Sequence, residues 1–233
     1  MVSKLLSIVI PALNEAEGLQ KVLDEIPEDE LHKMGYDIEV IVVDGGSVDG
    51  TRKIALERRA KLIYEPRRGY GRAYRTGLAM AKGDIIVTGD ADGQYPFSLI
   101  PALVKLMERE ELMFINTNRF YKYDPEAWRK VKIVGNKLLT LVFNIIFGCF
   151  IKDCQSGMWI IHRDLLKVMH LNSDGMEFSV EIKVQALRYA KEKFIEVPIY
   201  YRKRIGQNVK LRIFRDALRN LVYMVLFRLR SYS

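Results

Sequence analysis

Two acidic side chains that bracket a single residue carry the strongest chemical signal in the sequence. Asp90 and Asp92 stand just beyond an apolar run at 84–88, and Gln94 follows two residues later. Two carboxylates at a buried strand end repel each other unless a cation neutralises them. Oxygen ligands of this kind suit Mg²⁺ or Mn²⁺, which one or two carboxylates hold together with substrate phosphates. The sequence therefore predicts a metal–diphosphate site at Asp90, Asp92 and Gln94.

Polar residues also follow two other predicted strands, where structural and functional interpretations both stand. Asp44 is followed by Gly45 and Gly46, which permit a tight turn. Asp44 can bind a ribose hydroxyl or a base edge, or it can simply form the turn. Asn14 and Glu15 follow the first strand, where capping of the next helix would by itself account for them.

Three familiar motifs are absent from the sequence. Gly69 and Gly71 have the G-x-G spacing of a dinucleotide fingerprint, but Tyr74 stands where its third glycine belongs. There is no Gly-Lys-Ser/Thr phosphate loop and no G-x-S-x-G nucleophile elbow. The basic loop at 66–72 has two equal interpretations: contact with a phosphate at a helix N-terminus, or a solvated loop.

The elements that must position these residues alternate between short β-branched runs and longer helical patterns. Strands are predicted at 5–10, 38–43, 61–64, 84–88 and 112–116, and helices at 15–26, 50–59, 71–81 and 97–110. This alternation predicts an α/β fold with a mostly parallel sheet flanked by helices. Ligands of such sheets bind at the carboxyl ends of the strands, where the strand order reverses. Beyond about residue 120 the pattern becomes more helical.

The net charge of +8 is confined to one end of the chain. Residues 202–233 carry nine basic side chains and one acidic side chain, which accounts for the whole excess. A local excess of this kind indicates an anionic partner, namely nucleic acid, a membrane surface or a phosphorylated substrate, or else a solvated helix face.

Length and composition set the broad class. The 233 residues suit one globular domain with a short appendage, and no apolar run is long enough to span a membrane. The N-terminal run lacks the pattern of a secretory signal. Two cysteines are too few for a disulfide framework, so we expect a cytosolic protein.

Two segments have the pattern of helices that either meet a membrane or pack on the domain. The first, at 138–151, is apolar and too short to span a bilayer. The second, at 211–229, is basic and amphipathic, as is typical of helices that lie in the headgroup plane. Its predicted apolar stripe is Leu211, Phe214, Leu218, Leu221, Val222 and Val225, and its basic side is Arg212, Arg215, Arg219 and Arg230. We therefore divide the chain into a catalytic domain at 1–210 and a C-terminal amphipathic helix at 211–233 that could anchor it to a membrane surface.

Taken together, the motifs along most of the chain resemble those of the family 2 glycosyltransferases with a GT-A fold, and they occur in the same order as in that family. More narrowly, they are similar to the polyprenyl-phosphate glycosyltransferases, the group of the dolichyl-phosphate mannose and glucose synthases. The matching segments lie at 8–15, 42–51, 89–96, 118–119, 153–158, 175–178 and 196–199, followed by the basic run at 202–210.

The resemblance implies roles for individual residues. It implies that the nucleotide-sugar pocket is lined by Pro11, Asn14, Glu15, Asp44 and Asp90. It implies that the divalent ion, Mg²⁺ or Mn²⁺, is held by Asp90, Asp92 and Gln94, with Asp92 catalytic. It implies that the acceptor phosphate is bound by Arg119 and Arg129, and that the mouth of the site is formed by Arg202, Arg204 and Lys210. Gly45 replaces a second acid found in many relatives, which leaves UDP and GDP donors both open.

The implied reaction is inverting, metal-dependent transfer of glucose or mannose from a nucleotide sugar to dolichyl or polyprenyl phosphate. A phosphate acceptor is already anionic near pH 7, so it needs no general base. It does need cations that hold two anions together, and arginine suits this task. The resemblance implies a peripheral protein at the cytoplasmic face of a membrane.

Two alternatives remain. A glycosyltransferase acting on a soluble or protein-bound hydroxyl would need a general base, for which Asp153 and Glu177 are the candidates. A nucleic-acid-binding module would use the basic tail, but it would leave Asp44, Asp90 and Asp92 without a role. We therefore expect no nucleic-acid partner.

Overall fold

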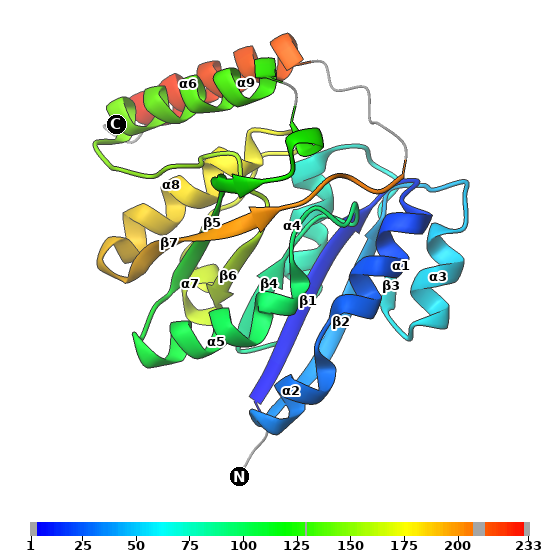
Figure 1. The fold of residues 1–233 in the computed structure, drawn as a ribbon. Helices are drawn as coiled ribbons and strands as arrows, with labels where there is room; N and C mark the ends of the chain where they lie inside the picture. Colours follow the sequence, from blue (N-terminus) through cyan, green and yellow to red (C-terminus); the bar gives the residue numbers. More distant parts are fainter. Residues whose placement is uncertain (1–3, 129, 207–212, 231–233) are drawn as a thin grey trace.

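The computed structural model describes residues 4–128, 130–206 and 213–230. Its centre is a seven-stranded sheet with the order β3-β2-β1-β4-β6-β5-β7 (Figure 1). The strands are β1 (Lys4–Ala12), β2 (Tyr36–Asp44), β3 (Lys61–Tyr64), β4 (Ile85–Thr88), β5 (Phe114–Tyr123), β6 (Trp159–His162) and β7 (Phe194–Tyr201). The α-helices are α1 (Ala16–Glu25), α2 (Glu28–Lys33), α3 (Thr51–Glu57), α4 (Tyr70–Met80), α5 (Ile100–Arg109), α6 (Lys130–Phe147), α7 (Arg163–Val168), α8 (Phe178–Ala190) and α9 (Ile213–Arg230).

The register of the sheet brings the predicted site residues to one edge. Strands β1, β2, β3 and β4 are mutually parallel, β5 and β7 are parallel, and β6 runs antiparallel to both β4 and β5. Ala12 lies beside Asp44, and Val9 lies beside Thr88. The strand order reverses between β1 and β4. The segments after β1, β2 and β4 therefore meet where open α/β sheets bind ligands.

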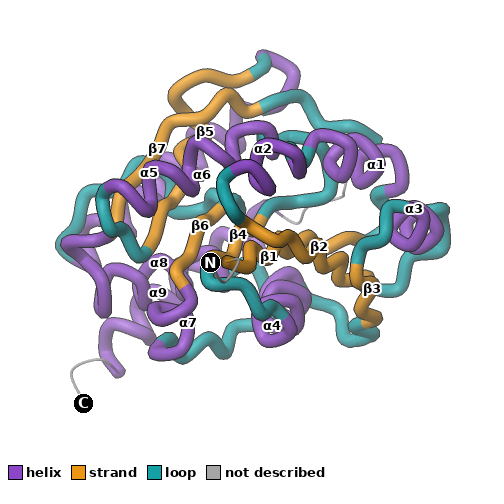
Figure 2. Tube along the Cα trace, turned by 90° about the horizontal axis from the view of Figure 1, so that it is seen from below, coloured by secondary structure: helices purple, strands orange, loops and turns teal. Residues whose placement is uncertain are grey.

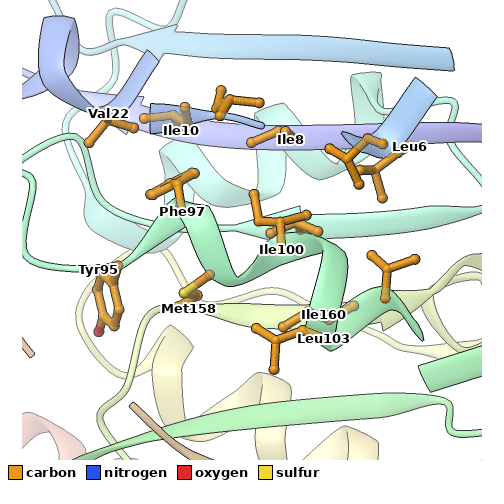
Figure 3. Close-up of a cluster of buried hydrophobic side chains, with 14 of the residues drawn as sticks. Leu6, Ile8, Ile10, Val22, Tyr95, Phe97, Ile100, Leu103, Met158 and Ile160 are labelled. Carbon is orange, nitrogen blue, oxygen red and sulfur yellow. The ribbon is translucent and has the colours of Figure 1, made fainter. Parts of the chain in front are cut away.

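Helices cover both faces of the sheet, and apolar periodicity explains how. In α5, the buried residues Ile100, Leu103, Val104 and Met107 recur at the spacing of one helix face. Helices α1, α2 and α5 lie on one side of the strands, and α4 lies on the other (Figure 2). The larger core lies under α1 and α5, where Phe97 and Ile100 pack against Ile8 and Ile10 of β1 (Figure 3).

Helices α6 and α9 form a pair that lies side by side at the end of the sheet where β5 and β7 finish (Figure 1). Phe143 of α6, Met224 of α9 and Val184 of α8 are buried in a third apolar cluster that joins the pair to the domain. Among the described residues, no helix combines the length and the apolar character that crossing a membrane would require.

The packing of α9 divides its predicted apolar stripe. Ala217, Leu221, Met224 and Phe227 face the domain. Leu218, Val222 and Val225 are exposed instead. Leu211 and Arg212 lie outside the described residues, as do the side chains of Phe214, Arg215 and Arg230. The proposed boundary at residue 210 also falls outside them.

The α/β class, the mostly parallel sheet and the C-terminal helix are confirmed. The structure adds α2, β6 and β7, and β5 is longer than the predicted 112–116. β7 contains Pro198, which cannot donate a ladder hydrogen bond. β7 is the last strand of the sheet, so one side of it needs no such donor.

The third cluster yields a stability prediction. Phe143→Ala should lower the free energy of unfolding by about 3–5 kcal/mol, because this fully buried ring leaves a cavity. Leu138→Ala on the same helix should change it by less than about 0.5 kcal/mol, because Leu138 is exposed. Urea unfolding of both variants measures this difference. Equal, small effects would show that α6 is not packed on the domain.

Candidate active site

Asp90 and Asp92 stand in the loop that follows β4, at the point where the strand order reverses. Asp92 is only 4% exposed. The Tyr74 hydroxyl of α4 donates to Asp90 Oδ1 at 2.9 Å, and this hydrogen bond orients the Asp90 carboxylate. The Gln94 backbone N–H donates to Asp92 Oδ1 at 3.1 Å. Both side chains are therefore oriented by the fold itself.

The segment after β7 crosses this loop and supplies the nearest cation. The Arg204 guanidinium lies 2.5 Å from Asp92 Oδ2 and also pairs with Glu15, which precedes α1. The Ile205 backbone N–H donates to the Asp92 carbonyl at 2.9 Å. Arg204 is thus held between two carboxylates from different elements, and its role at the mouth of the site stays a prediction.

The carboxyl groups around Arg204 are short of positive charge. Burial raises the pKa of Asp90, and the neighbouring Asp92 charge raises it further. Burial also raises the pKa of Asp92, although Arg204 opposes this effect. Burial raises the pKa of Glu15 to about 7, again against Arg204. A further cation at this place would relieve the repulsion.

These residues fit the divalent ion that the sequence predicts. The carboxylates of Asp90 and Asp92 are hard oxygen ligands, and the buried Glu15 Oε2 has no hydrogen-bond partner. Within the described parts of the chain, no group of three or more His, Cys, Asp or Glu side chains could hold a metal by itself. An ion here would need oxygens from a bound diphosphate as well.

Gln94 has a different environment from the two aspartates. Its side-chain oxygen accepts a hydrogen bond from the Tyr201 hydroxyl at 2.9 Å, and its amide nitrogen donates to the Arg202 carbonyl at 3.0 Å. Gln94 thus ties the end of β7 to the Asp90–Asp92 loop. Its role as a metal ligand stays a prediction.

The predicted nucleotide side of the site is a tightly hydrogen-bonded set of loops. Asp44 accepts hydrogen bonds from the backbone N–H groups of Gly46 and Ser47, and it pairs with Arg52 at 2.5 Å. Burial alone would raise the pKa of Asp44, but the hydrogen bonds from Ser47 and Arg52 lower it, so the group is an anion. Asn14 Oδ1 accepts from the Val48 N–H at 2.9 Å, joining the loops after β1 and β2. Pro11 lies beside Val43, one residue before the end of β1.

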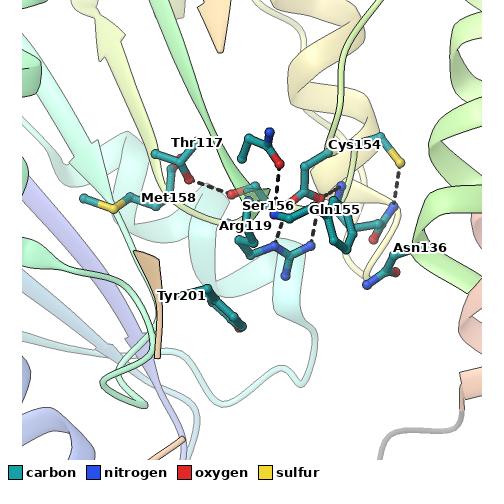
Figure 4. A network of polar contacts seen from close by, with 12 residues as sticks. Thr117, Arg119, Asn136, Cys154, Gln155, Ser156, Met158 and Tyr201 are labelled. Atoms are coloured by element: carbon teal, nitrogen blue, oxygen red, sulfur yellow. Dashed lines mark hydrogen bonds and ion pairs between the residues drawn. The ribbon is translucent and has the colours of Figure 1, made fainter. Parts of the chain in front are cut away.

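Arg119, the predicted acceptor-phosphate ligand, is 7% exposed and already holds one anion. Its Nε and Nη2 donate to the two oxygens of Asp153 at 2.7 and 2.8 Å. The guanidinium carbon lies 4.9 Å from the Trp128 ring centre and 5.4 Å from that of Tyr201. Figure 4 shows the guanidinium between Tyr201 and the side chains of Gln155 and Asn136. One edge of Arg119 therefore remains for a further acceptor.

The other basic residues predicted for the site either pair with a residue outside it or lie outside the described residues. Arg202 turns to Glu25 at the end of α1, with both contacts at 2.6 Å, and does not pair with the site aspartates. Arg129 and Lys210 lie outside the described residues. The structure thus brings together Glu15, Asp90, Asp92 and Arg204.

Sequence reasoning missed two glycines and two tyrosines that support the site. A Cβ at Gly18 of α1 would overlap the backbone of Ala91 and Asp92, so this glycine lets α1 approach the loop. A Cβ at Gly157 would collide with the Tyr70 hydroxyl beside Asp90. In the sequence pattern, Tyr74 and Tyr201 have the spacing of ordinary core residues, and the hydrogen-bond partners of their hydroxyl groups are not evident. Only the fold reveals these contacts.

The sequence profile of glycosyl transferase family 2 matches residues 7–169, which is more than half of the chain.

The chain belongs to glycosyl transferase family 2.

Two relatives show how this family 2 chain compares with named proteins. It is 34% identical over 223 residues to the low-salt glycan biosynthesis hexosyltransferase Agl6 of Haloferax volcanii, covering 94% of this chain and 53% of that protein. It is 30% identical over 252 residues to the dolichyl-phosphate beta-glucosyltransferase of Saccharomyces cerevisiae, covering 96% of this chain and 74% of that protein. The chain thus spans about half the length of Agl6.

A solved structure supports the same assignment. Glucosyl-3-phosphoglycerate synthase of Mycobacterium tuberculosis, in complex with Mn²⁺, UDP and glucosyl-3-phosphoglycerate, superimposes with a TM-score of 0.74 at 25% identity. The match covers 97% of this chain and 80% of that one. The family and the fold predicted from sequence are both confirmed.

A buried lysine beneath the site is a further feature of this family 2 chain. Lys183 of α8 is fully buried, and its Nζ donates to the carbonyls of Ser156 and Ser179 at 2.8 and 2.9 Å. Burial lowers the pKa of Lys183 to about 7, even though Asp153 opposes this effect. Lys183 thus holds the loop that carries Asp153, the partner of Arg119.

This shift predicts a pH-dependent stability difference. Between pH 7 and about 10 the unfolded chain binds a proton at Lys183 that the folded chain does not, so wild-type stability falls as the pH falls through this window. On going from pH 10 to pH 7, the free energy of unfolding of Lys183→Met should rise relative to that of wild type by up to about 1.4 kcal/mol per pH unit. Urea unfolding at several pH values measures the difference. Parallel pH profiles for the two proteins would contradict a depressed lysine pKa.

Proposed function

We propose that the chain is a metal-dependent, inverting hexosyltransferase that moves glucose or mannose from a UDP- or GDP-sugar to polyprenyl or dolichyl phosphate. The observation that carries this proposal is the pair of carboxylates at the switch point of the sheet, of which Asp92 is buried and Asp90 is partly buried. Membership of family 2 supports glycosyl transfer, and the yeast relative acts, by its name, on dolichyl phosphate.

The donor side follows from the charges. Asp90 and Asp92 would hold Mg²⁺ or Mn²⁺, which when bound neutralises the charge of the departing diphosphate. Arg204 can exchange its contacts with Asp92 and Glu15 for the diphosphate oxygens, because it lies between the two acids. Asp44, already anionic, would accept hydrogen bonds from ribose or base, with Pro11 and Asn14 shaping the same pocket.

The acceptor side favours a phosphate over a hydroxyl group. Asp153, one candidate base for a hydroxyl acceptor, is fully buried and paired through both oxygens with Arg119. Burial would raise its pKa, but Arg119 holds it below the usual range. A carboxylate of this kind is a poor proton acceptor near pH 7. Arg119, with Arg129 as the proposed second ligand, would instead receive an acceptor that is already anionic.

An exposed apolar surface supports a lipid-linked acceptor. We name the outward faces of α6 and α9 together the helix-pair face. The face comprises Val131, Val134, Leu138, Leu141 and Ile145 of α6 and Leu218, Val222, Val225, Leu226 and Leu229 of α9. Many exposed apolar side chains on two adjoining helices are typical of an interaction site. We propose that the helix-pair face lies in the cytoplasmic surface of a membrane and brings Arg119 to a polyprenyl phosphate.

A soluble acceptor is the second candidate, because the superimposed synthase was solved with glucosyl-3-phosphoglycerate. The test is a screen of the purified protein with Mn²⁺ or Mg²⁺, each nucleotide sugar, and either a short polyprenyl phosphate or 3-phosphoglycerate. We expect β-linked polyprenyl phosphate sugar as the product. Transfer to 3-phosphoglycerate alone would replace the proposed acceptor.

The metal assignment makes its own prediction. Asp92→Ala should lower transfer by more than about a hundredfold, because even outer partners of metal ligands cost 10–100-fold. EDTA should abolish wild-type activity. Asp37→Ala, which removes an exposed acid on β2, should leave both activity and the unfolding midpoint unchanged. Full activity of Asp92→Ala in EDTA would refute the metal role.

The membrane assignment is tested on the helix-pair face. The triple variant Leu141→Ser, Ile145→Ser and Val225→Ser should bind vesicles at least about a hundredfold more weakly, because three half-exposed side chains lose about 1 kcal/mol of burial each. The matched control changes Leu56, Met80 and Val168, which are exposed elsewhere, to Ser. Equal sedimentation of both triple variants with vesicles would rule out docking through this face.

A further inference from the structure

A cavity of about 300 Å³ opens where the ends of α6 and α9 meet α8. Its apolar walls include Phe147, Leu187 and Phe227, and its basic side chains are Arg188, Lys191 and Arg228. No acidic side chain lines it among the residues that the structure describes. The cavity therefore combines an apolar interior with three positive charges.

The cations are suited to an anionic ligand. Arg188 and Lys191 are exposed and form no ion pair within the described parts of the chain. The planar guanidinium groups of Arg188 and Arg228 match the oxygens of a phosphate, and Lys191 adds a third charge. Inorganic phosphate has no carbon atoms, so it would make no apolar contacts with the walls of the cavity.

The position of the cavity indicates where the ligand comes from. Phe147 and Phe227 lie with their ring centres 6.3 Å apart and belong to the cluster that faces α8. Leu141, Ile145, Val225 and Leu229 point away from that cluster, on the helix-pair face. A helix is about 10 Å across, so the cavity would lie at the depth of lipid headgroups when the helix-pair face contacts the acyl chains.

We propose that this cavity binds the phosphate headgroup and glycerol of an anionic phospholipid. The inference rests on the membrane contact of the proposed function and goes beyond it by naming the lipid class. The cavity shares no lining residue with the surroundings of Arg119, namely Asp153, Gln155, Trp128 and Tyr201. The bound lipid is thus an anchor that orients the enzyme, and a separate molecule from the acceptor.

The first experiment compares vesicles of phosphatidylcholine alone with vesicles that also contain phosphatidylglycerol. Wild type should bind the mixed vesicles more tightly. The double variant Arg188→Gln and Lys191→Gln should lose about thirtyfold in that affinity, because each basic residue near an anionic surface contributes about fivefold. The control, Lys21→Gln with Lys193→Gln, removes the same charge from outside the cavity and should lose less than about threefold. Equal losses in the two variants, or no preference of wild type for phosphatidylglycerol, would overturn the proposal.

A second experiment separates a lipid site from a general anion site. Short-chain phosphatidylglycerol, below its micelle concentration, should bind wild type and not the Arg188→Gln, Lys191→Gln variant. Inorganic phosphate should compete weakly, because it lacks the apolar contacts. Competition by inorganic phosphate as strong as by the lipid would overturn the lipid assignment.

Transfer activity keeps this inference distinct from the proposed function. In detergent with a short polyprenyl phosphate, the Arg188→Gln, Lys191→Gln variant should be as active as wild type. If wild type shows no transfer to polyprenyl phosphate yet binds phosphatidylglycerol as described, the proposed acceptor is wrong and the lipid site stands. If transfer occurs and lipid binding fails, the lipid site is wrong and the proposed acceptor stands.

Discussion

The repulsion between two neighbouring carboxylates, the buried Asp92 and the partly buried Asp90, is the constraint on which the rest of the site depends. The pair stands where the strand order reverses, which is where an open α/β sheet forms a crevice for ligands. Within the chain, Arg204 and the Tyr74 hydroxyl offset part of the repulsion. The offset is incomplete, since the pKa values of Asp90 and Asp92 stay raised. On the proposed function, that residual imbalance would favour the binding of a cation together with a diphosphate.

The same electrostatic logic separates donor from acceptor. Around the aspartates negative charge is in excess, whereas Arg119 is matched one to one by Asp153 and lies beside the rings of Trp128 and Tyr201. The Tyr201 hydroxyl donates a hydrogen bond to Gln94, and the Tyr201 ring contacts Arg119. A single aromatic residue of β7 therefore joins the two halves of the site, the aspartate loop and the surroundings of Arg119. Since β7 also leads into Arg204, one short stretch of backbone connects the two halves.

A part of the fold or of the site could be predicted from sequence where the residue type alone indicates the role. It could not be predicted where the role depends on which residues lie next to it in the fold. Asp90 and Asp92 were identifiable because acids directly after an apolar strand have no packing role. β7 was not, because Pro198 argues against a strand unless its place at the sheet edge is known. Tyr74 was missed for a related reason: a tyrosine on an amphipathic helix looks like core until its hydroxyl partner, 16 positions away in sequence, is located.

The helix pair shows where periodicity stops being informative. A hydrophobic stripe on α9 says that one face is apolar, but α9 has two apolar faces, one against Phe143 and Val184 and one open. A helix that is apolar on opposite sides must satisfy two different surroundings at once. The domain supplies one of them through the third cluster. We propose that the other is an apolar phase outside the domain: a membrane would supply it and would present a lipid-linked phosphate to Arg119. On this proposal, the open face of the pair and the arginine beneath it are two parts of one arrangement, in which docking and acceptor binding would occur in the same step.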